Sequence, residues 1–200
     1  MVKYYLSKKL LLTAVFTVAM CNLSRGLAFS DTVSVFVGDC GFAKNTPMKR
    51  CHPKRTNDIE SVGISFSRNL DLELSRYFTL KLHTGIVSMK TYERFDESYN
   101  KSTTYAFLGP LLRFPVLQKN HFDLYADLSI GVGFFSDDKF GNTNLGGHFS
   151  FRDEVSLGLG LGELKRYGVK LSIAHYSHAD LLGEVNPGIT IPEVNFYFKF

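Results

Sequence analysis

The strongest constraint on the fold is a strict alternation of apolar side chains with small or polar ones. From Phe122 to Phe134 every second residue is apolar, and the residues between them are Asp, Tyr, Ser or Gly. Residues 155–162 repeat the pattern with Val and Leu against Ser and Gly. Because successive side chains of a strand point to opposite faces, each segment predicts a strand with one apolar face.

The same reading along the chain predicts eight strands. They are expected at about 31–38, 59–70, 77–92, 103–114, 122–134, 146–162, 169–177 and 189–200. The longer polar connections follow the first, third, fifth and seventh strands. Pro110 falls inside the fourth segment and makes it the least regular, since proline inside a strand is typical of an edge or a bulge.

Two architectures accommodate eight such strands. A soluble lipocalin-type barrel turns its apolar side chains inward, which would leave the Gly/Ser-rich faces in water; the chain has no Trp and no helical pattern to support a ligand calyx. An outer-membrane barrel turns them outward and alternates short turns with long loops. We therefore predict an all-β, eight-stranded antiparallel transmembrane β-barrel with both termini on the periplasmic side.

Residues 1–30 have the features of a signal peptide. Three lysines in the first nine residues precede an apolar run over 10–20, and Ala28-Phe29-Ser30 offers small residues for cleavage before Asp31. A lipoprotein reading at Cys21 is disfavoured by the bulky Met20. The prediction is a signal peptide over 1–30 and a single barrel domain over 31–200, exported to the outer membrane. No later stretch approaches the ~20 apolar residues that a membrane helix needs.

Charge and cysteine usage narrow the function classes. Four of the 23 basic residues and none of the 19 acidic ones lie in residues 1–30, so the remainder is balanced and nucleic acid is not an expected partner. Cys40 and Cys51 flank a basic loop, and export favours a disulfide between them over a metal site. His52 is the single hint of a metal ligand, and we expect neither metal nor organic cofactor.

The strand at 169–177 carries the candidate chemistry. Val169, Leu171 and Ile173 share one face with His175 and Ser177. Two residues along a strand are roughly 6 to 7 Å apart, and a serine nucleophile needs a base such as histidine within reach. The strand runs upward from the turn at 163–166, so the pair would face outer-leaflet lipid. In the alternative, His175 and Tyr176 belong to the interfacial aromatic zone and Ser177 begins a loop.

These residues resemble a known family. His175-Tyr176-Ser177-His178-Ala179 and the downstream Asn186-Pro187-Gly188 are similar to the His-x-Ser-Asn-Ala and Asn-x-Gly motifs of the PagL family, the lipid A 3-O-deacylases. The segment from Phe149 to Gly160 is also similar to the one before that motif. The resemblance implies an outer-membrane barrel that removes the ester-linked acyl chain at the 3-position of lipid A. It assigns the base to His175, the nucleophile to Ser177, and a place near the oxyanion to Asn186.

Two positions depart from the family pattern. His178 stands where the family has asparagine, and Thr190 stands where it has the triad glutamate. With Asn186, both are predicted to belong to the substrate or oxyanion site. Glu193 has the wrong parity and is expected to point inward, unless a bulge intervenes. Glu184, in the loop before the last strand, is the predicted substitute acid.

The predicted function is hydrolysis of an acyl ester of lipid A in outer-leaflet lipopolysaccharide by a serine and a histidine. The alternative is a catalytically weak or inactive barrel whose extracellular loops bind envelope or host molecules. A pore is disfavoured because side chains fill the interior of an eight-stranded barrel. The sequence leaves the cleaved chain and the oligomeric state open.

Overall fold

The computed structural model describes residues 31–40, 59–70, 77–92, 100–141, 143–178 and 188–200. The predicted signal peptide lies outside this part of the chain. No helix within the described ranges is long and apolar enough to span a membrane.

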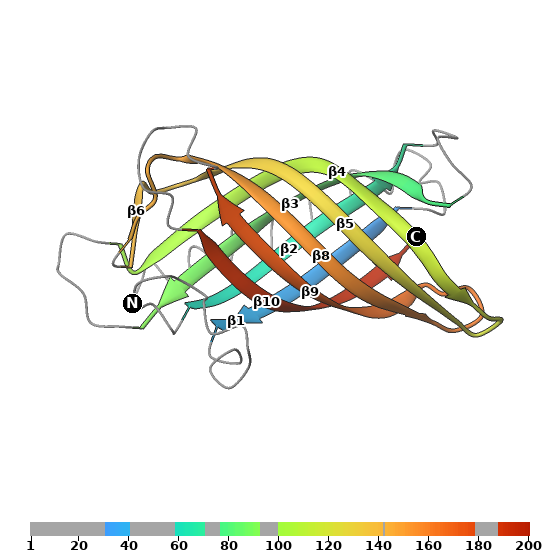
Figure 1. The fold of residues 1–200 in the computed structure, drawn as a ribbon. Coiled ribbons are helices and arrows are strands. Elements are labelled where there is room, and N and C mark those ends of the chain that lie inside the picture. The colour runs from blue at the N-terminus through green and yellow to red at the C-terminus, as the bar shows by residue number, and fades with distance from the viewer. Residues whose placement is uncertain (1–30, 41–58, 71–76, 93–99, 142, 179–187) are drawn as a thin grey trace.

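The described strands close into an antiparallel barrel of eight (Figure 1). The barrel strands are β1 (Thr32–Asp39), β2 (Ile59–Asn69), β3 (Thr79–Thr91), β4 (Ser102–Gln118), β5 (Phe122–Phe135), β8 (Phe149–Leu161), β9 (Tyr167–Ser177) and β10 (Ile189–Lys199). Sequence neighbours pair throughout, and β1 closes the barrel against β10. The predicted fold class and all eight predicted strands are confirmed, with their ends moved by a few residues.

Two details of the sheet depart from the sequence prediction. A small hairpin of β6 (Lys139–Phe140) and β7 (Thr143–Asn144) lies in the connection from β5 to β8. The segment with Pro110 is a full barrel strand, β4, but its pairing with β5 passes over Gly109 and Pro110 and shifts between Pro115 and Leu117. Proline lacks the N–H that a regular ladder needs, and here it falls at an irregularity in the pairing. At the same place the Ser129 hydroxyl, on β5, donates a hydrogen bond of 3.1 Å to the Pro110 carbonyl oxygen.

The outer face of the barrel is apolar. Ile130, Phe134 and Val155 are 62%, 61% and 60% exposed, and the same parity continues along β5 and β8. Water-soluble monomers rarely expose a continuous apolar surface of this kind. The lipocalin-type alternative is therefore wrong, and the apolar face is the one that meets lipid.

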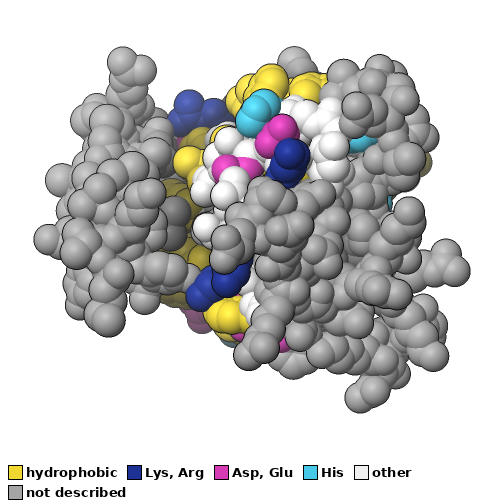
Figure 2. All heavy atoms as spheres, turned by 90° about the vertical axis from the view of Figure 1, so that its left-hand side faces the viewer, with side chains coloured by type: hydrophobic (Ala, Val, Ile, Leu, Met, Phe, Trp, Pro, Cys, Tyr) yellow, Lys and Arg dark blue, Asp and Glu magenta, His cyan; other side chains and the backbone are white. Residues whose placement is uncertain are grey.

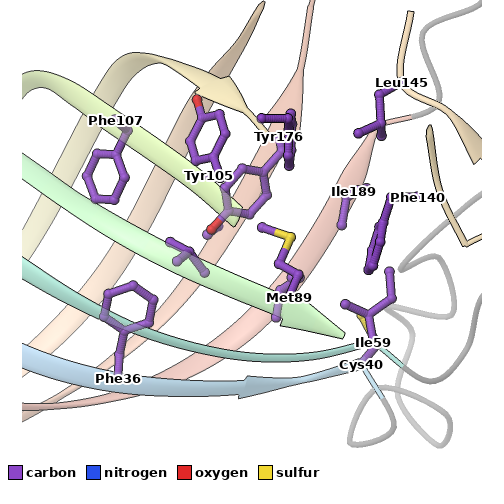
Figure 3. Close-up of a cluster of buried hydrophobic side chains, with 14 residues drawn as sticks. Phe36, Cys40, Ile59, Met89, Tyr105, Phe107, Phe140, Leu145, Tyr176 and Ile189 are labelled. Atoms are coloured by element: carbon purple, nitrogen blue, oxygen red, sulfur yellow. The ribbon is translucent and has the colours of Figure 1, made fainter. Parts of the chain in front are cut away.

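The interior combines charged groups with aromatic rings. Lys81, Asp127 and Arg152 are each no more than 3% exposed although they are charged. At the loop end a cluster that includes Met89, Tyr105 and Tyr176 fills the barrel (Figure 3). Glycines leave room for such rings, since a Cβ on Gly158 would lie 2.2 Å from Cζ of Tyr125.

Aromatic side chains gather at both ends of the barrel wall. Near the loops the ring of Phe149 lies 5.7 Å from that of Phe134 and 5.1 Å from that of Phe151. At the end where the chain terminates, Phe198 lies 5.1 Å from Tyr167 and 5.0 Å from Phe200. Such girdles mark the two membrane interfaces of outer-membrane barrels. The C-terminal ends of β1, β3, β5 and β9 thus lie at one interface, and the C-terminus of the chain lies at the other (Figure 1).

Candidate active site

His175 lies at the centre of an outward-facing row near the loop end of the barrel. On β9 it pairs directly with Asp153 of β8 on one side and with Thr190 of β10 on the other. All three side chains are half-buried on the lipid-facing parity. We call these three residues the His175 row. Figure 2 views the molecule from this end, where histidine, acidic and basic side chains lie close to hydrophobic ones.

Thr190 contacts the imidazole. Its Oγ1 lies 2.8 Å from Nδ1 of His175, which is hydrogen-bond distance. If Nδ1–H donates to Thr190, the other ring nitrogen, Nε2, keeps its lone pair and can accept a proton. Thr190 therefore occupies the outward face beside His175, as its parity predicts, and presents a hydroxyl to the ring.

Ser177 lies two residues beyond His175 on the same face. Its backbone carbonyl accepts a hydrogen bond of 3.1 Å from Ser150 Oγ, and its partner across β8 is Phe151. Among the described residues no hydrogen bond joins the Ser177 hydroxyl to His175. Catalytic hydrogen bonds are often long in free enzymes and shorten when substrate binds. The predicted shared face is confirmed, while the catalytic roles remain predictions.

Two glycines shape the surroundings of the site. Gly188 has a φ of 51°, and a Cβ there would lie 2.9 Å from Cε1 of His175. Only glycine adopts that backbone readily and leaves that space. His178 is 2% exposed and lies against Gly146 of the β5–β8 connection, where a Cβ would come within 2.5 Å of its Nε2. Its predicted place near the oxyanion remains a prediction.

A charged network inside the barrel holds the strands of the His175 row together. Arg152 Nε donates to the Tyr176 hydroxyl at 3.1 Å, and its NH2 group donates to Glu193 Oε2 at 2.9 Å. Tyr176 in turn lies 3.3 Å from Glu193 Oε1. Glu154 accepts hydrogen bonds from both Arg152 and Lys170. Arg152 precedes Asp153 and Tyr176 follows His175, so the inner network fixes the backbone from which the outer row projects.

An apolar groove lies on the outer wall directly below the His175 row. Its volume is about 720 Å³. The walls include two successive outward rows that cross β8, β9 and β10: Val155, Ile173, Pro192, Leu157, Leu171 and Val194. The groove therefore begins one row from His175 and continues toward the middle of the membrane.

Comparison with known proteins places this geometry in a family. The family model described as lipid A 3-O-deacylase (PagL) matches residues 60–199, well over half of the chain. The chain belongs to the lipid A 3-O-deacylase family. The resemblance drawn from the motif at His175 is therefore confirmed, and the barrel is an outer-membrane barrel.

Two individual proteins are similar to this chain. Lipid A deacylase PagL of Bordetella bronchiseptica (strain ATCC BAA-588 / NCTC 13252 / RB50) is 33% identical over 76 residues, which cover 38% of this chain and 41% of that protein. The solved structure titled "Crystal structure of the outer membrane enzyme PagL" aligns with a TM-score of 0.63 at 18% identity. That alignment covers 84% of this chain and 99% of the solved one, and it supports the fold.

The remaining predicted site residues of this deacylase-family chain have different outcomes. Glu193 points inward, as its parity predicts, and is 2% exposed. Glu184, Asn186 and Cys51 lie outside the described residues, so the substitute acid, the oxyanion group and the disulfide stay predictions. The Cys40 sulfur lies 3.5 Å from the carbonyl oxygen of Thr190. Within the described ranges no three His, Cys, Asp or Glu side chains are grouped to hold a metal ion.

Asp153 is the member of the row that sequence reasoning missed. The predicted acid, Glu184, follows Ser177 in the chain, whereas Asp153 lies on β8, the strand before His175. A signal was present, because the turn after β8 is centred near Leu164, and counting back equally along both strands brings Asp153 opposite His175. The register across a tight turn therefore contained the information.

Proposed function

We propose that this protein is a lipid A 3-O-deacylase in which Ser177 is the nucleophile and His175 the general base. The observation that carries the proposal is the position of both side chains on the lipid-facing wall, directly above an apolar groove. A soluble hydrolase would enclose such a pair in a pocket. Here the substrate has to be part of the surrounding membrane.

The depth of the pair suits an acyl ester. β9 extends from Tyr167 to Ser177 over 11 residues, which at a tilt of about 40° corresponds to a height of about 25 Å. This is the height of the apolar band of an outer-membrane barrel. Since Tyr167 belongs to the lower girdle, Ser177 stands at the upper interface, where headgroup and acyl chains of an outer-leaflet lipid are joined.

The groove suits an acyl chain attached to that ester. Its volume of about 720 Å³ is in the range of pockets for small ligands. Each methylene moved from water into such a groove contributes about 0.8 kcal/mol, although a chain already in lipid gains less. The groove therefore acts mainly by aligning the chain so that its ester reaches Ser177.

The proposed reaction uses the Ser177 hydroxyl as the nucleophile and the His175 imidazole as the base. His175 Nε2 accepts the hydroxyl proton as Ser177 Oγ attacks the ester carbonyl carbon. The sugar alkoxide then leaves with that proton, and the acyl group remains on Ser177. Water, activated by the same nitrogen, hydrolyses the acyl-serine and restores the free hydroxyl. Thr190 holds the imidazole in the tautomer that leaves Nε2 unprotonated.

One observation favours the second candidate, a weak or inactive barrel whose loops bind envelope or host molecules. The group hydrogen-bonded to His175 Nδ1 is a hydroxyl, and replacing the orienting acid of a serine protease triad costs about 10⁴-fold in turnover. Under this candidate the barrel would keep the scaffold with little activity.

The two candidates are separated by incubating the refolded protein with lipopolysaccharide in detergent and analysing the lipid by mass spectrometry. Deacylation predicts the loss of one hydroxyacyl chain and no reaction with Ser177→Ala. Ser88→Ala is a matched control, because Ser88 also faces outward and is half-buried, on β3. Intact lipid A, or equal activity in Ser177→Ala, would reject the serine deacylase.

A further inference from the structure

We infer that Asp153 is a positioning residue that supplies the negative charge beside His175, while Thr190 sets the ring tautomer. The two tasks that one carboxylate performs in a serine triad are then divided between the two strands flanking β9. This inference rests on the proposed deacylase function and identifies the acid on which that function depends.

The sheet register places Asp153 beside the imidazole. Asp153 of β8 is the direct cross-strand partner of His175, as Thr190 of β10 is on the other side. Directly opposed residues have Cβ atoms about 4.5 to 5.5 Å apart. An aspartate and a histidine at that separation on one face can bring carboxylate and ring within a few ångströms of each other.

The distribution of polar side chains on the outer wall sets this residue apart. The outward positions of β8, β9 and β10 are apolar except at Asp153, His175, Ser177 and Thr190, and at Tyr167 in the opposite girdle. Val155, Leu157, Leu159 and Leu161 continue the outward parity of Asp153. A lone carboxylate on a lipid-facing strand is unfavourable, and beside the candidate base and nucleophile it has a chemical reason to be there.

The ionic partners of the neighbouring acids strengthen this contrast. Inside the barrel Glu154 and Glu193 pair with Arg152, and Asp127 pairs with Arg113 at 2.8 Å. Within the described ranges Asp153 has no ion pair and no side-chain hydrogen bond. Its carboxylate is therefore available to a positive charge that develops next to it.

That charge appears during the reaction. When the Ser177 proton reaches Nε2, His175 becomes an imidazolium, and the Thr190 hydroxyl can bond to it without neutralising it. The Asp153 carboxylate then stabilises the imidazolium through space, as the aspartate of a serine triad does. At a wall in contact with hydrocarbon the effective dielectric constant is low, so the attraction is stronger than in water.

The test is a four-protein cycle of the wild type, Asp153→Asn, Thr190→Glu and the double variant, with kcat and KM for lipid A deacylation measured in each. We expect Asp153→Asn to lower kcat about 100-fold or more and to change KM little. Thr190→Glu places a carboxylate on the other side of His175. The double variant should therefore recover to within about tenfold of Thr190→Glu alone, and Asp153→Glu should retain more activity than Asp153→Asn.

The outcomes separate a failure of the inference about Asp153 from a failure of the proposed deacylase function. A double variant as slow as Asp153→Asn would show that Asp153 acts only through the fold, and a wild-type rate in Asp153→Asn would also overturn the inference. A wild type no faster than Ser177→Ala would reject the proposed function itself, and the inference with it. The electrophoretic mobility of unboiled samples reports whether each variant forms the closed barrel.

Discussion

The inner and outer faces of β8, β9 and β10 use polar residues in opposite ways. Inside, Arg152, Glu154, Lys170 and Glu193 form a charge-balanced network in which each ion has an opposite partner. Outside, the few polar side chains stand in an apolar sheet and share a single hydrogen bond within the described ranges, between His175 and Thr190. Satisfied buried charges fix a structure. Polar groups that lack most of their partners on a lipid-facing wall indicate that a bound substrate supplies those partners.

The largest expected effect is on the outer face. His175→Ala removes the proposed base and should lower the deacylation rate about 10⁴-fold or more, because base and nucleophile act as a unit. The closed barrel should persist, since His175 contributes nothing to the inner network. The measurement is release of the hydroxyacyl chain followed by mass spectrometry. His121→Ala, at an exposed turn at the opposite end, is the control, and equal losses in both variants would contradict the assignment.

The next largest effect is expected on the inner face, where a substitution removes an ion from the buried network. Arg152→Met leaves Glu154 and Glu193 without their shared cation and should cost about 3 to 5 kcal/mol of unfolding free energy. Denaturant unfolding in detergent or lipid measures it.

Arg113→Met provides the matched comparison, because Arg113 makes two hydrogen bonds of 2.8 and 2.9 Å to Asp127 toward the far end of the barrel. Both variants should be destabilised, and only Arg152→Met should also lose activity beyond its loss of folded protein. Equal specific activity in the two folded variants would separate the inner network from the His175 row.

A smaller effect is expected in the groove. Leu171→Asn places an amide in its apolar wall and should raise the apparent KM about 30-fold, equivalent to about 2 kcal/mol, with little change in kcat. Ile86→Asn is the control on β3, where an apolar side chain is 37% exposed at mid-strand. If both substitutions raised KM alike, the groove would have no part in positioning the acyl chain.

The sequence predicted this fold well because side-chain parity is a local property. Alternation alone located the barrel strands, gave His175 and Ser177 one face, and turned Glu193 inward. The β6–β7 hairpin has only two residues on each strand, too few to show a period.

The sequence was less informative about what depends on register across several strands. Arg152 and Glu193 form a hydrogen bond with each other although they are 41 residues apart in the chain. No local pattern encodes that contact. Asp153 is intermediate. The sequence analysis missed it, although one tight turn relates it to His175 and a count from that turn would have placed the two residues opposite each other.

The smallest expected effect concerns Thr190 and is the most direct test of how far the outer face tolerates change. Thr190→Val keeps the shape of the side chain and removes the hydroxyl that lies 2.8 Å from His175 Nδ1. A neutral hydrogen bond of this kind contributes about 0.5 to 1.5 kcal/mol, so kcat should fall by about tenfold at most. Stability should not fall, because valine suits a lipid-facing strand. Thr84→Val is the control, since Thr84 is also half-buried and donates a hydrogen bond of 2.8 Å, to the carbonyl of Phe107 on β4. A loss in Thr190→Val as large as that in Asp153→Asn would mean that the hydroxyl, rather than the carboxylate, is the main support of the imidazole.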